Sequence, residues 1–147
     1  MRVAALAAAD LDAVLPLIAA YQRFYETEPD EARNRAFFAR FLDPSDAGAL
    51  LGAWDGDDLV GHACLYYTFS SVEAVDMVLM NDLYVVESRR GAGVGRRLID
   101  ATVDVARRRG AGVVRWMTAP DNHRAQRLYD RTGAEASTWL EYEIRVG

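Results

Sequence analysis

The sequence predicts one α/β (α+β) domain over residues 1–147, with a mixed, mostly antiparallel sheet of about six to seven strands and helices on both faces. Three observations predict this fold. Apolar residues recur at helical spacing in four segments, strand-like apolar runs lie between them, and neither an internal repeat nor a low-complexity linker divides the chain. A chain of this length is also large enough to bury a core of its own.

The first part of the chain is expected to form a short strand at 1–5 and then a helix. Apolar residues at helical spacing begin at Leu11, and Asp10 or Asp12 can cap this helix. The helix is expected to end at Glu28–Pro29, because proline lacks the amide hydrogen that a continuing helix needs.

A second helix and three strands are predicted next. Asp30 can cap the helix, and Asp43–Pro44 stops it. Two strand-like runs within 49–69 flank Asp55–Gly56–Asp57, which is a strong hairpin signal, and a third strand covers 74–86. Three adjacent strands joined by short turns predict an antiparallel meander.

The second half predicts a parallel unit and two closing elements. An amphipathic helix over 94–110 precedes a buried strand at Val113–Met117, so the strand–helix–strand unit of 78–117 should hold the parallel part of the sheet. Asp121–Asn122 can cap another helix, and Thr138–Val146 is expected to be a final strand.

Charge and hydropathy narrow the classes of function. The formal charge is −5 at pH 7, and all 17 basic residues are Arg, which a GC-rich genome also explains. Residues 1–88 carry −10 and residues 89–147 carry +5, which suggests ligands, or parts of one ligand, of opposite charge. A net acidic chain argues against binding to nucleic acid, and no apolar run is long enough for a membrane span.

Cysteine and histidine usage argues against a metal site. Cys64 is the only cysteine, which excludes a disulfide framework and any cysteine-based metal site. His62 and His123 are far apart in the sequence, so no metal is expected. The first residues do not form a signal peptide, because Asp10 and Asp12 follow a short apolar run, and a cytoplasmic protein is therefore expected.

The segment with the strongest functional signal is the loop at 87–97. A predicted strand ends before it, three glycines alternate within it, and a helix opens from it. Glycine lets backbone amides turn toward one point, and the helix N-terminus adds partial positive charge. The residues around that point are Arg89, Arg90, Gly91, Ala92, Gly93, Val94, Gly95, Arg96 and Arg97. This pattern predicts an anion cradle for phosphate, and the alternative is a tight loop before a solvated, Arg-lined helix.

Two common phosphate-binding loops do not fit this segment. A dinucleotide fingerprint needs glycine where Arg96 stands, and an acid about 20 residues further on, where the chain reads Val113–Val114–Arg115. A Walker loop needs lysine, which the chain lacks.

Two motifs are similar to those of a known superfamily. Arg90, Gly93 and Gly95 form an R-x-x-G-x-G pattern that resembles the acyl-CoA-binding motif of the GNAT N-acetyltransferase superfamily. Residues 122–134 resemble its N-x-x-A-x-x-L-Y-x-x-x-G-(A/F) element, with a predicted strand between the two motifs. The order of elements follows the GNAT pattern over nearly the whole chain. The segments NDLYV and YQRFYE look most like the branch of polyamine and histone acetyltransferase-like proteins.

The resemblance implies acetyl-CoA as the cofactor. The family's pyrophosphate site falls on the loop amides, its pantetheine arm runs along the backbone of the preceding strand, and the start of the helix after Asn122 contacts the cofactor further along. The matching positions are Leu83, Tyr84, Val85, Arg89, Arg90, Gly91, Ala92, Gly93, Val94, Gly95, Arg96, Asn122, Ala125 and Tyr129.

The resemblance also implies a catalytic role for Tyr129. This residue matches the tyrosine near the thioester sulfur, which acts as a general acid toward the leaving thiolate. A thiol has a pKa of about 8.5 and a tyrosine of about 10, so proton donation requires close geometry. The other interpretation of Tyr129 is an aromatic core residue on an amphipathic helix.

The general base is less well defined. An amine acceptor must lose a proton before it attacks, and polyamine-like relatives often carry an acid where this chain has Asn81, which cannot be a base. Asp82 is the next candidate, although successive strand residues point to opposite faces. Glu73, Asp76 and a water relay are alternatives. A strand amide near Leu83 is expected to stabilise the oxyanion.

These features predict an acetyl-CoA-dependent N-acetyltransferase that works by direct transfer in a ternary complex. Its acceptor is expected to be a primary amine of a small molecule (a polyamine, an amino acid or an aminoglycoside-like compound) or of a peptide. Acidic residues within 26–31 and 55–58 would attract a cationic acceptor. The alternatives are a non-catalytic acyl-CoA-binding sensor and an interaction protein whose Arg-rich helix binds acidic partners. The resemblance also implies a homodimer as one assembly.

Overall fold

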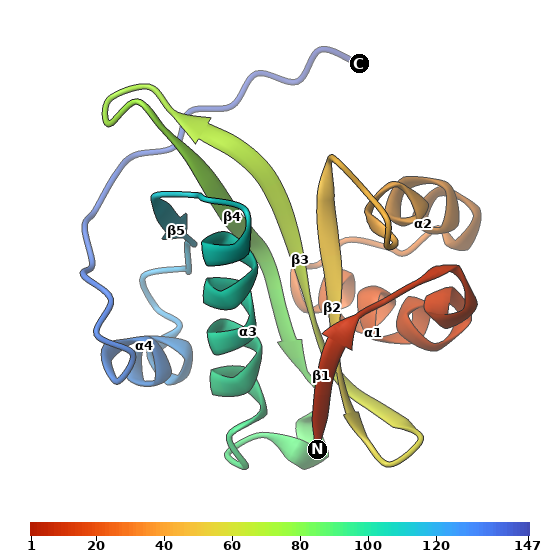
Figure 1. Ribbon diagram of the computed structural model, residues 1–147. Coiled ribbons are helices and arrows are strands. Elements are labelled where there is room, and N and C mark those ends of the chain that lie inside the picture. Colours follow the sequence, from red (N-terminus) through yellow and green to blue (C-terminus); the bar gives the residue numbers. More distant parts are fainter. The chain divides into compact units, whose positions relative to one another are not determined.

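The larger part of the chain is built on a five-stranded sheet. The computed structural model describes every residue from Met1 to Gly147 and divides into two units, Met1–Met117 and Thr118–Gly147, each of which is described by itself. The strands of the first unit follow the order β1–β2–β3–β4–β5 across the sheet (Figure 1). They are β1 (Arg2–Ala5), β2 (Gly48–Asp55), β3 (Asp58–Ser70), β4 (Val75–Val85) and β5 (Val113–Arg115).

The strand pairing is antiparallel except at one edge. β1, β2, β3 and β4 pair antiparallel in succession, whereas β5 pairs with β4 in parallel, with Met77 opposite Val113. The predicted hairpin forms between Asp55 and Asp58, with Gly56 at φ 61°. The prediction of a mixed, mostly antiparallel sheet is confirmed, but the sheet has five strands instead of six to seven.

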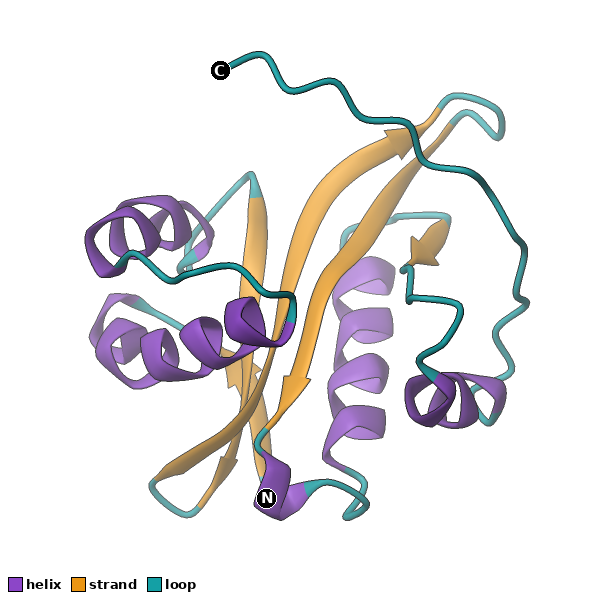
Figure 2. Cartoon of the chain, turned by 180° about the vertical axis from the view of Figure 1, so that it is seen from behind, coloured by secondary structure: helices purple, strands orange, loops and turns teal.

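Helices cover both faces of the sheet, as predicted. α1 (Leu11–Phe24) and α2 (Glu31–Phe38) lie on one face, and α3 (Val94–Arg108) lies on the other (Figure 1 and Figure 2). α3 packs closely on β3, because a Cβ placed on Gly61 would lie 3.1 Å from Val94 and 3.2 Å from Leu98. The backbone between β4 and β5 therefore crosses over that face, which explains their parallel pairing.

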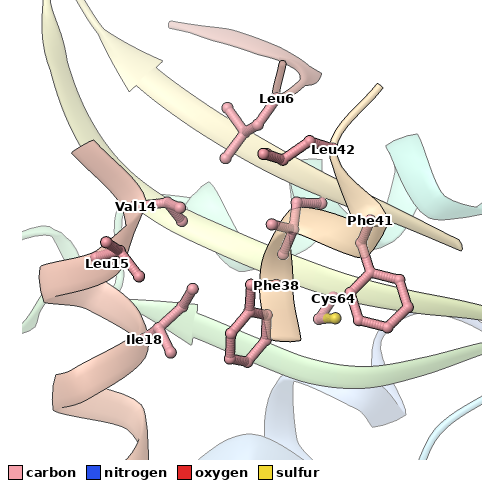
Figure 3. Packing of buried hydrophobic residues seen from close by; sticks show 9 residues of the cluster. Leu6, Val14, Leu15, Ile18, Phe38, Phe41, Leu42 and Cys64 are labelled. Carbon is pink, nitrogen blue, oxygen red and sulfur yellow. The ribbon is translucent and has the colours of Figure 1, made fainter. Parts of the chain in front are cut away.

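A hydrophobic core lies between the sheet and the first two helices. Apolar side chains of α1 and α2 interlock there with those of β2 and β3 (Figure 3). The buried residues of this cluster are Leu6, Val14, Leu15, Ile18, Phe38, Phe41, Leu42, Leu50 and Cys64. Because each large apolar side chain contributes about 1.5–3 kcal/mol on full burial, this cluster fixes α1 against the sheet.

α1 ends before the predicted boundary at Glu28–Pro29. Its last residue is Phe24, and the amide of Tyr25 still donates to the carbonyl of Tyr21 at 3.3 Å. Glu26 then adopts φ 60°, a left-handed conformation that a right-handed helix cannot continue through. The acidic stretch that follows is therefore a loop, and Asp30 begins α2 by accepting a hydrogen bond from the amide of Arg33 at 2.9 Å.

β4 contains a bulge that the sequence pattern does not reveal. On β3, Cys64 pairs with Asp82, but the next residue, Leu65, pairs with Met80, so Asn81 is an extra residue on β4. An extra residue changes which face the following side chains occupy. The Sδ atom of Met80 accordingly accepts a hydrogen bond from the Thr102 hydroxyl of α3, at 3.8 Å. Asp82 instead pairs with Cys64, on the opposite face, which α1 covers.

The second unit contains one helix and an extended tail. α4 (His123–Asp130) is capped by Asn122, whose Oδ1 accepts from the amide of Ala125 at 3.2 Å, as predicted. The predicted strand at Thr138–Val146 does not form: β5 is the last strand of the chain, and a strand needs a partner, which the second unit does not contain. Its large apolar side chains are exposed: Trp139, Leu140, Tyr142, Ile144 and Val146.

Candidate active site

The predicted anion cradle forms where β4 passes into α3. A 3₁₀ turn at Glu87–Arg89 follows the strand, and Gly91 and Gly93 then adopt φ 83° and 85°. Gly93 is the N-cap of α3 and has no side-chain cap. The first helical hydrogen bond runs from Arg97 N to Gly93 O at 3.1 Å, so the amides of the first turn are left for another acceptor.

The cradle is open where an anion would bind. A Cβ placed on Gly91 or on Gly93 would meet no atom within 4 Å, so both positions need glycine for their backbone conformation and not for lack of room. Any side chain there would fill the space above the loop. Uncapped amides, a helix dipole and open space together fit the phosphates of a CoA thioester.

The loop arginines already form ion pairs and hydrogen bonds within the protein, which their spacing in the sequence did not suggest. Arg89 forms an ion pair with Asp55 of the β2–β3 hairpin, and Arg96 pairs with Asp100 at 3.0 Å. Arg90 Nε donates to the carbonyl of Val85 at 3.0 Å. Arg97 donates to the Met1 carbonyl at 3.4 Å. The positive charge of the cradle is thus partly neutralised, and its backbone amides are the better-defined anion ligands.

Asp82 is the buried acid of the site. The bulge turns it into the α1 face, where it is only 6% exposed and lies opposite Cys64. Burial raises the pKa of Asp82 to about 6, and the hydrogen bond from Asn81 Nδ2, at 2.8 Å, opposes this rise. A carboxyl that titrates near neutral pH suits a general base, because it can both accept and release a proton.

Asp82 also influences its neighbours on the same face. Burial raises the pKa of the Cys64 thiol, and the nearby Asp82 carboxylate raises it further. The pKa of Tyr66 is raised chiefly by burial and, to a lesser extent, by Cys64 and Asp82. Both groups therefore stay protonated at neutral pH, and Asp82 is the group among them that can take up a proton.

The other two candidate bases lie at the opposite end of the strand. Asp76 is exposed near the start of β4, and Glu73 is exposed in the turn before it. Six residues separate Asp76 from Asp82, which corresponds to roughly 20 Å of extended chain. Both carboxyls are exposed, whereas that of Asp82 is buried.

An aromatic group beside Asp82 includes His62, which the sequence analysis did not predict as a site residue. Tyr84 of β4, His62 of β3 and Tyr21 of α1 form a triangle with ring centroids 6.0–6.4 Å apart. The guanidinium of Arg90 lies 5.6 Å from the Tyr84 ring, which connects this group to the cradle. The period of two along β3 places His62 and Cys64 on one face, and this was the signal available in the sequence.

The remaining predicted residues belong to the second unit. Asn122 caps α4, Ala125 donates its amide to that cap, and Tyr129 lies near the end of the same helix. Asn122 and Ala125 thus set the start of the helix, and Tyr129 follows one turn after Ala125.

One cavity lies outside this site. A cavity of about 320 Å³ opens between α3 and the β1–β2 side of the sheet, and neither the glycine loop nor Asp82 lines it. No group of three or more His, Cys, Asp or Glu side chains is placed to hold a metal ion. None of the helices has the length and apolar character that a membrane crossing requires.

The chain is similar in sequence and in fold to known proteins. Residues 14–134 match the acetyltransferase (GNAT) family. The uncharacterized N-acetyltransferase YhfO of Bacillus subtilis is 33% identical over 93% of this chain and 92% of its own. The D-amino-acid N-acetyltransferase HPA3 of Saccharomyces cerevisiae is 39% identical over 76% of this chain and 70% of its own. A crystal structure of a probable acetyltransferase superposes with a TM-score of 0.87 and 27% identity, over 100% of this chain and 99% of that one.

Proposed function

The chain belongs to the GNAT acetyltransferase family, and on this premise we propose that it transfers an acetyl group from acetyl-CoA to a primary amine in a ternary complex. The observation that carries the proposal is the open, uncapped glycine cradle ahead of α3, together with a buried acid on the strand that leads into it. Both substrates then meet along one strand, and positioning them there supplies much of the rate.

The cradle and β4 are the proposed binding surface for acetyl-CoA, which when bound supplies the acetyl group as a reactive thioester. The amides between Gly91 and Arg96 hold the pyrophosphate, and Arg89 and Arg90 add charge beside them. The backbone of Leu83–Val85 hydrogen-bonds the pantetheine arm as an added strand does. An amide near Leu83 stabilises the negative charge that develops on the reacting carbonyl oxygen.

Asp82 is the proposed general base. A primary amine is protonated at neutral pH, with a pKa of about 10.4, and only its neutral form attacks. Asp82 takes that proton, either directly or through a water molecule. Its pKa of about 6 leaves it mostly ionised at pH 7, so it is ready to accept.

Tyr129 is the proposed general acid. Its support is the motif that residues 122–134 share with the family, in which this tyrosine protonates the departing thiolate. Tyr129→Phe should keep the affinity for acetyl-CoA and lower kcat by about 10-fold or more. The same kcat as the unmodified chain at every pH would remove Tyr129 from this role.

The acceptor is proposed to be a small cationic amine, with amino acids as the first class to test. The end of α1 exposes Phe24 and Tyr25, and the exposed acids Glu26 and Glu28 follow. Aromatic faces and carboxylates both attract ammonium groups. HPA3, a relative with 39% identity, is a D-amino-acid N-acetyltransferase, which supports this choice.

Thermal unfolding with acetyl-CoA is the first test. Saturating acetyl-CoA should raise Tm, because a ligand that binds only the folded chain stabilises it. An unchanged Tm would refute both the enzyme and the sensor. Release of free thiol should then follow with D- and L-amino acids, polyamines, aminoglycosides or peptides. Binding without thiol release for any of these amines would identify the non-catalytic acyl-CoA sensor instead.

A homodimer is proposed through the C-terminal segment 138–146. Its apolar side chains alternate with Glu141, Glu143 and Arg145, which is the pattern of a strand, and a second copy of the segment would supply the missing neighbour. Light scattering should show a dimer that Ile144→Asp dissociates. Val72→Asp, at another exposed apolar position, should leave the dimer intact. A monomeric unmodified chain would contradict this assembly.

A cytoplasmic location is proposed with this activity. Cys64 is a buried free thiol and the chain has no other cysteine, which suits a compartment that keeps thiols reduced. Fractionation of cells that express the natural gene should recover the protein with the soluble cytoplasmic enzymes.

A further inference from the structure

His62 is a buried polar side chain without a protein partner. It lies on β3 between Gly52 of β2 and Tyr84 of β4, and it is 0% exposed. Neither Nδ1 nor Nε2 has a hydrogen-bond partner. Folded proteins leave few buried polar groups unpaired, so this ring requires an explanation.

The imidazole is neutral in this position. Burial lowers the pKa of His62 to about 4, so at neutral pH the ring carries one N–H donor and one nitrogen acceptor. Both groups are costly to bury unpaired, whereas a phenyl ring would fill the same position without that cost. The chain therefore keeps a histidine where packing alone would favour phenylalanine.

The surroundings of His62 place it at the acceptor end of the site. α1 contributes Tyr21, whose ring centroid lies 6.3 Å away, and β4 contributes Tyr84, at 6.0 Å. The hydroxyl of Tyr21 makes a long hydrogen bond of 3.4 Å to the carbonyl of Asn81 at the bulge. Two charged groups adjoin these residues: Asp82 on β4, and Arg90, whose guanidinium lies 5.6 Å from the centre of the Tyr84 ring.

His62 and Asp82 are diagonal neighbours across the β3–β4 pair. His62 lies opposite Tyr84, and Asp82 lies opposite Cys64, two residues along. Diagonal neighbours in an antiparallel pair are about 7–8 Å apart, and no direct hydrogen bond joins these two side chains, so one bridging water could link them.

We propose that His62 is a positioning residue for acetyl transfer, and that it holds the water molecule through which the acceptor amine passes its proton to Asp82. This role rests on the function proposed above. The water takes a proton from the ammonium nitrogen and gives one of its own to an Asp82 oxygen, and the freed lone pair attacks the acetyl carbon. The C–S bond then breaks with its electron pair on sulfur, and the thiolate leaves as the free thiol with the second proton that the nitrogen loses. A ring nitrogen of His62 hydrogen-bonds the water and stays neutral throughout.

The test is His62→Phe, which keeps an aromatic ring but removes both nitrogens. Its Tm should rise by about 2–5 °C, because the ring nitrogen that does not hold the water is a buried polar group without a partner, and it disappears. Its kcat should fall by about 10-fold with the affinity for acetyl-CoA unchanged. The kcat of the unmodified chain should level off above pH 6, once Asp82 is ionised. The kcat of His62→Phe should instead keep rising with pH, toward the pKa of the acceptor amine.

Two further variants separate this role from packing. His62→Gln restores a donor and an acceptor and should recover part of kcat. Ile18→Val, in the buried cluster of the same face, should lower Tm without altering the pH profile. An unchanged kcat and pH profile in His62→Phe, or a lower Tm, would overturn the role of His62 alone. Absence of thiol release by the unmodified chain with every amine would overturn the proposed function and this role together.

Discussion

The glycine loop after β4 and the bulge within β4 form two different kinds of site on one stretch of chain. The loop exposes backbone amides, and Gly91 and Gly93 leave the space above it open. The bulge buries a carboxyl, Asp82, and thereby raises its pKa to about 6. Binding therefore depends on the absence of side chains in one region, and proton transfer depends on the burial of one side chain in the other. Substitutions should be able to affect each separately.

The largest expected effect is on the loop. Gly93→Val should weaken acetyl-CoA binding by about 100-fold or more, because the valine side chain fills the open space above the amides. This fold-change corresponds to the loss of roughly two charge-assisted hydrogen bonds. Isothermal titration of acetyl-CoA into the variant measures this loss.

Gly110 provides a matched control for Gly93. It follows the other end of α3, has φ 72° and is equally open at its Cβ position. Gly93→Val and Gly110→Val should therefore share the cost of a left-handed residue, about 1–2 kcal/mol in the free energy of unfolding. Only Gly93→Val should lose its affinity for acetyl-CoA. Equal affinities in the two variants would show that the cradle lies elsewhere.

The next effect belongs to the bulge. Asp82→Asn should lower kcat by about 100-fold while the affinity for acetyl-CoA stays within a factor of two or so, because only the proton acceptor is lost. Asp76→Asn, an exposed acid on the same strand, is the control and should keep full activity. Loss of kcat in Asp76→Asn instead would transfer the base to the other end of β4.

The same variant should change the pH dependence of stability. The pKa of Asp82 is about 6 in the folded chain, above its ordinary 3.8, so between these values the folded state holds a proton that the unfolded state has lost. The contribution of Asp82 to the free energy of unfolding should therefore fall as pH rises from about 4 to 6, by up to about 3 kcal/mol. His62, whose pKa is lowered by burial to about 4, contributes a rise of similar size over the same range, so the unmodified chain should show little net change. Asp82→Asn should leave only the rise, so its free energy of unfolding should be higher at pH 8 than at pH 4, as urea unfolding at the two pH values would show.

Local sequence patterns predict the parts of this molecule that depend on neighbouring residues. The hairpin at Asp55–Asp58, the cap at Asn122 and the glycine loop are each set by a few adjacent side chains, and each forms where expected. The order of helices and strands through β5 follows for the same reason, since helical and strand periods are properties of short segments.

The features that depend on distant residues could not be predicted in this way. The bulge at Asn81 is a mismatch between β3 and β4, and strict alternation left the direction of Asp82 open. The partnerless state of His62 depends on α1, β2 and β4 together. The segment 138–146 has a strand pattern, but pairing requires a second strand that its own sequence does not contain.

A smaller effect should come from the hydrogen bond within the bulge. Asn81 Nδ2 donates to Asp82 Oδ1 at 2.8 Å and lowers the pKa of that carboxyl. Asn81→Ala should therefore raise the pKa and move the acidic limb of the kcat profile upward by about half a unit to one unit. Asn81→Asp would move it further by repulsion between two carboxylates. An acidic limb at the same pH in all three chains would mean that it reports another group.

The smallest effect should come from removing a loop arginine, because this tests whether charge or the backbone holds the anion. Arg89 already pairs with Asp55, and both side chains are partly exposed, so its charge is screened by its partner and by solvent. Arg89→Ala should weaken acetyl-CoA binding by about threefold, against 100-fold for Gly93→Val. Asp55→Ala, which frees the guanidinium, should strengthen binding by a similar small factor and make it more sensitive to salt. A loss in Arg89→Ala as large as that in Gly93→Val would reverse the order and make the arginine, and not the amides, the main anion ligand of this loop.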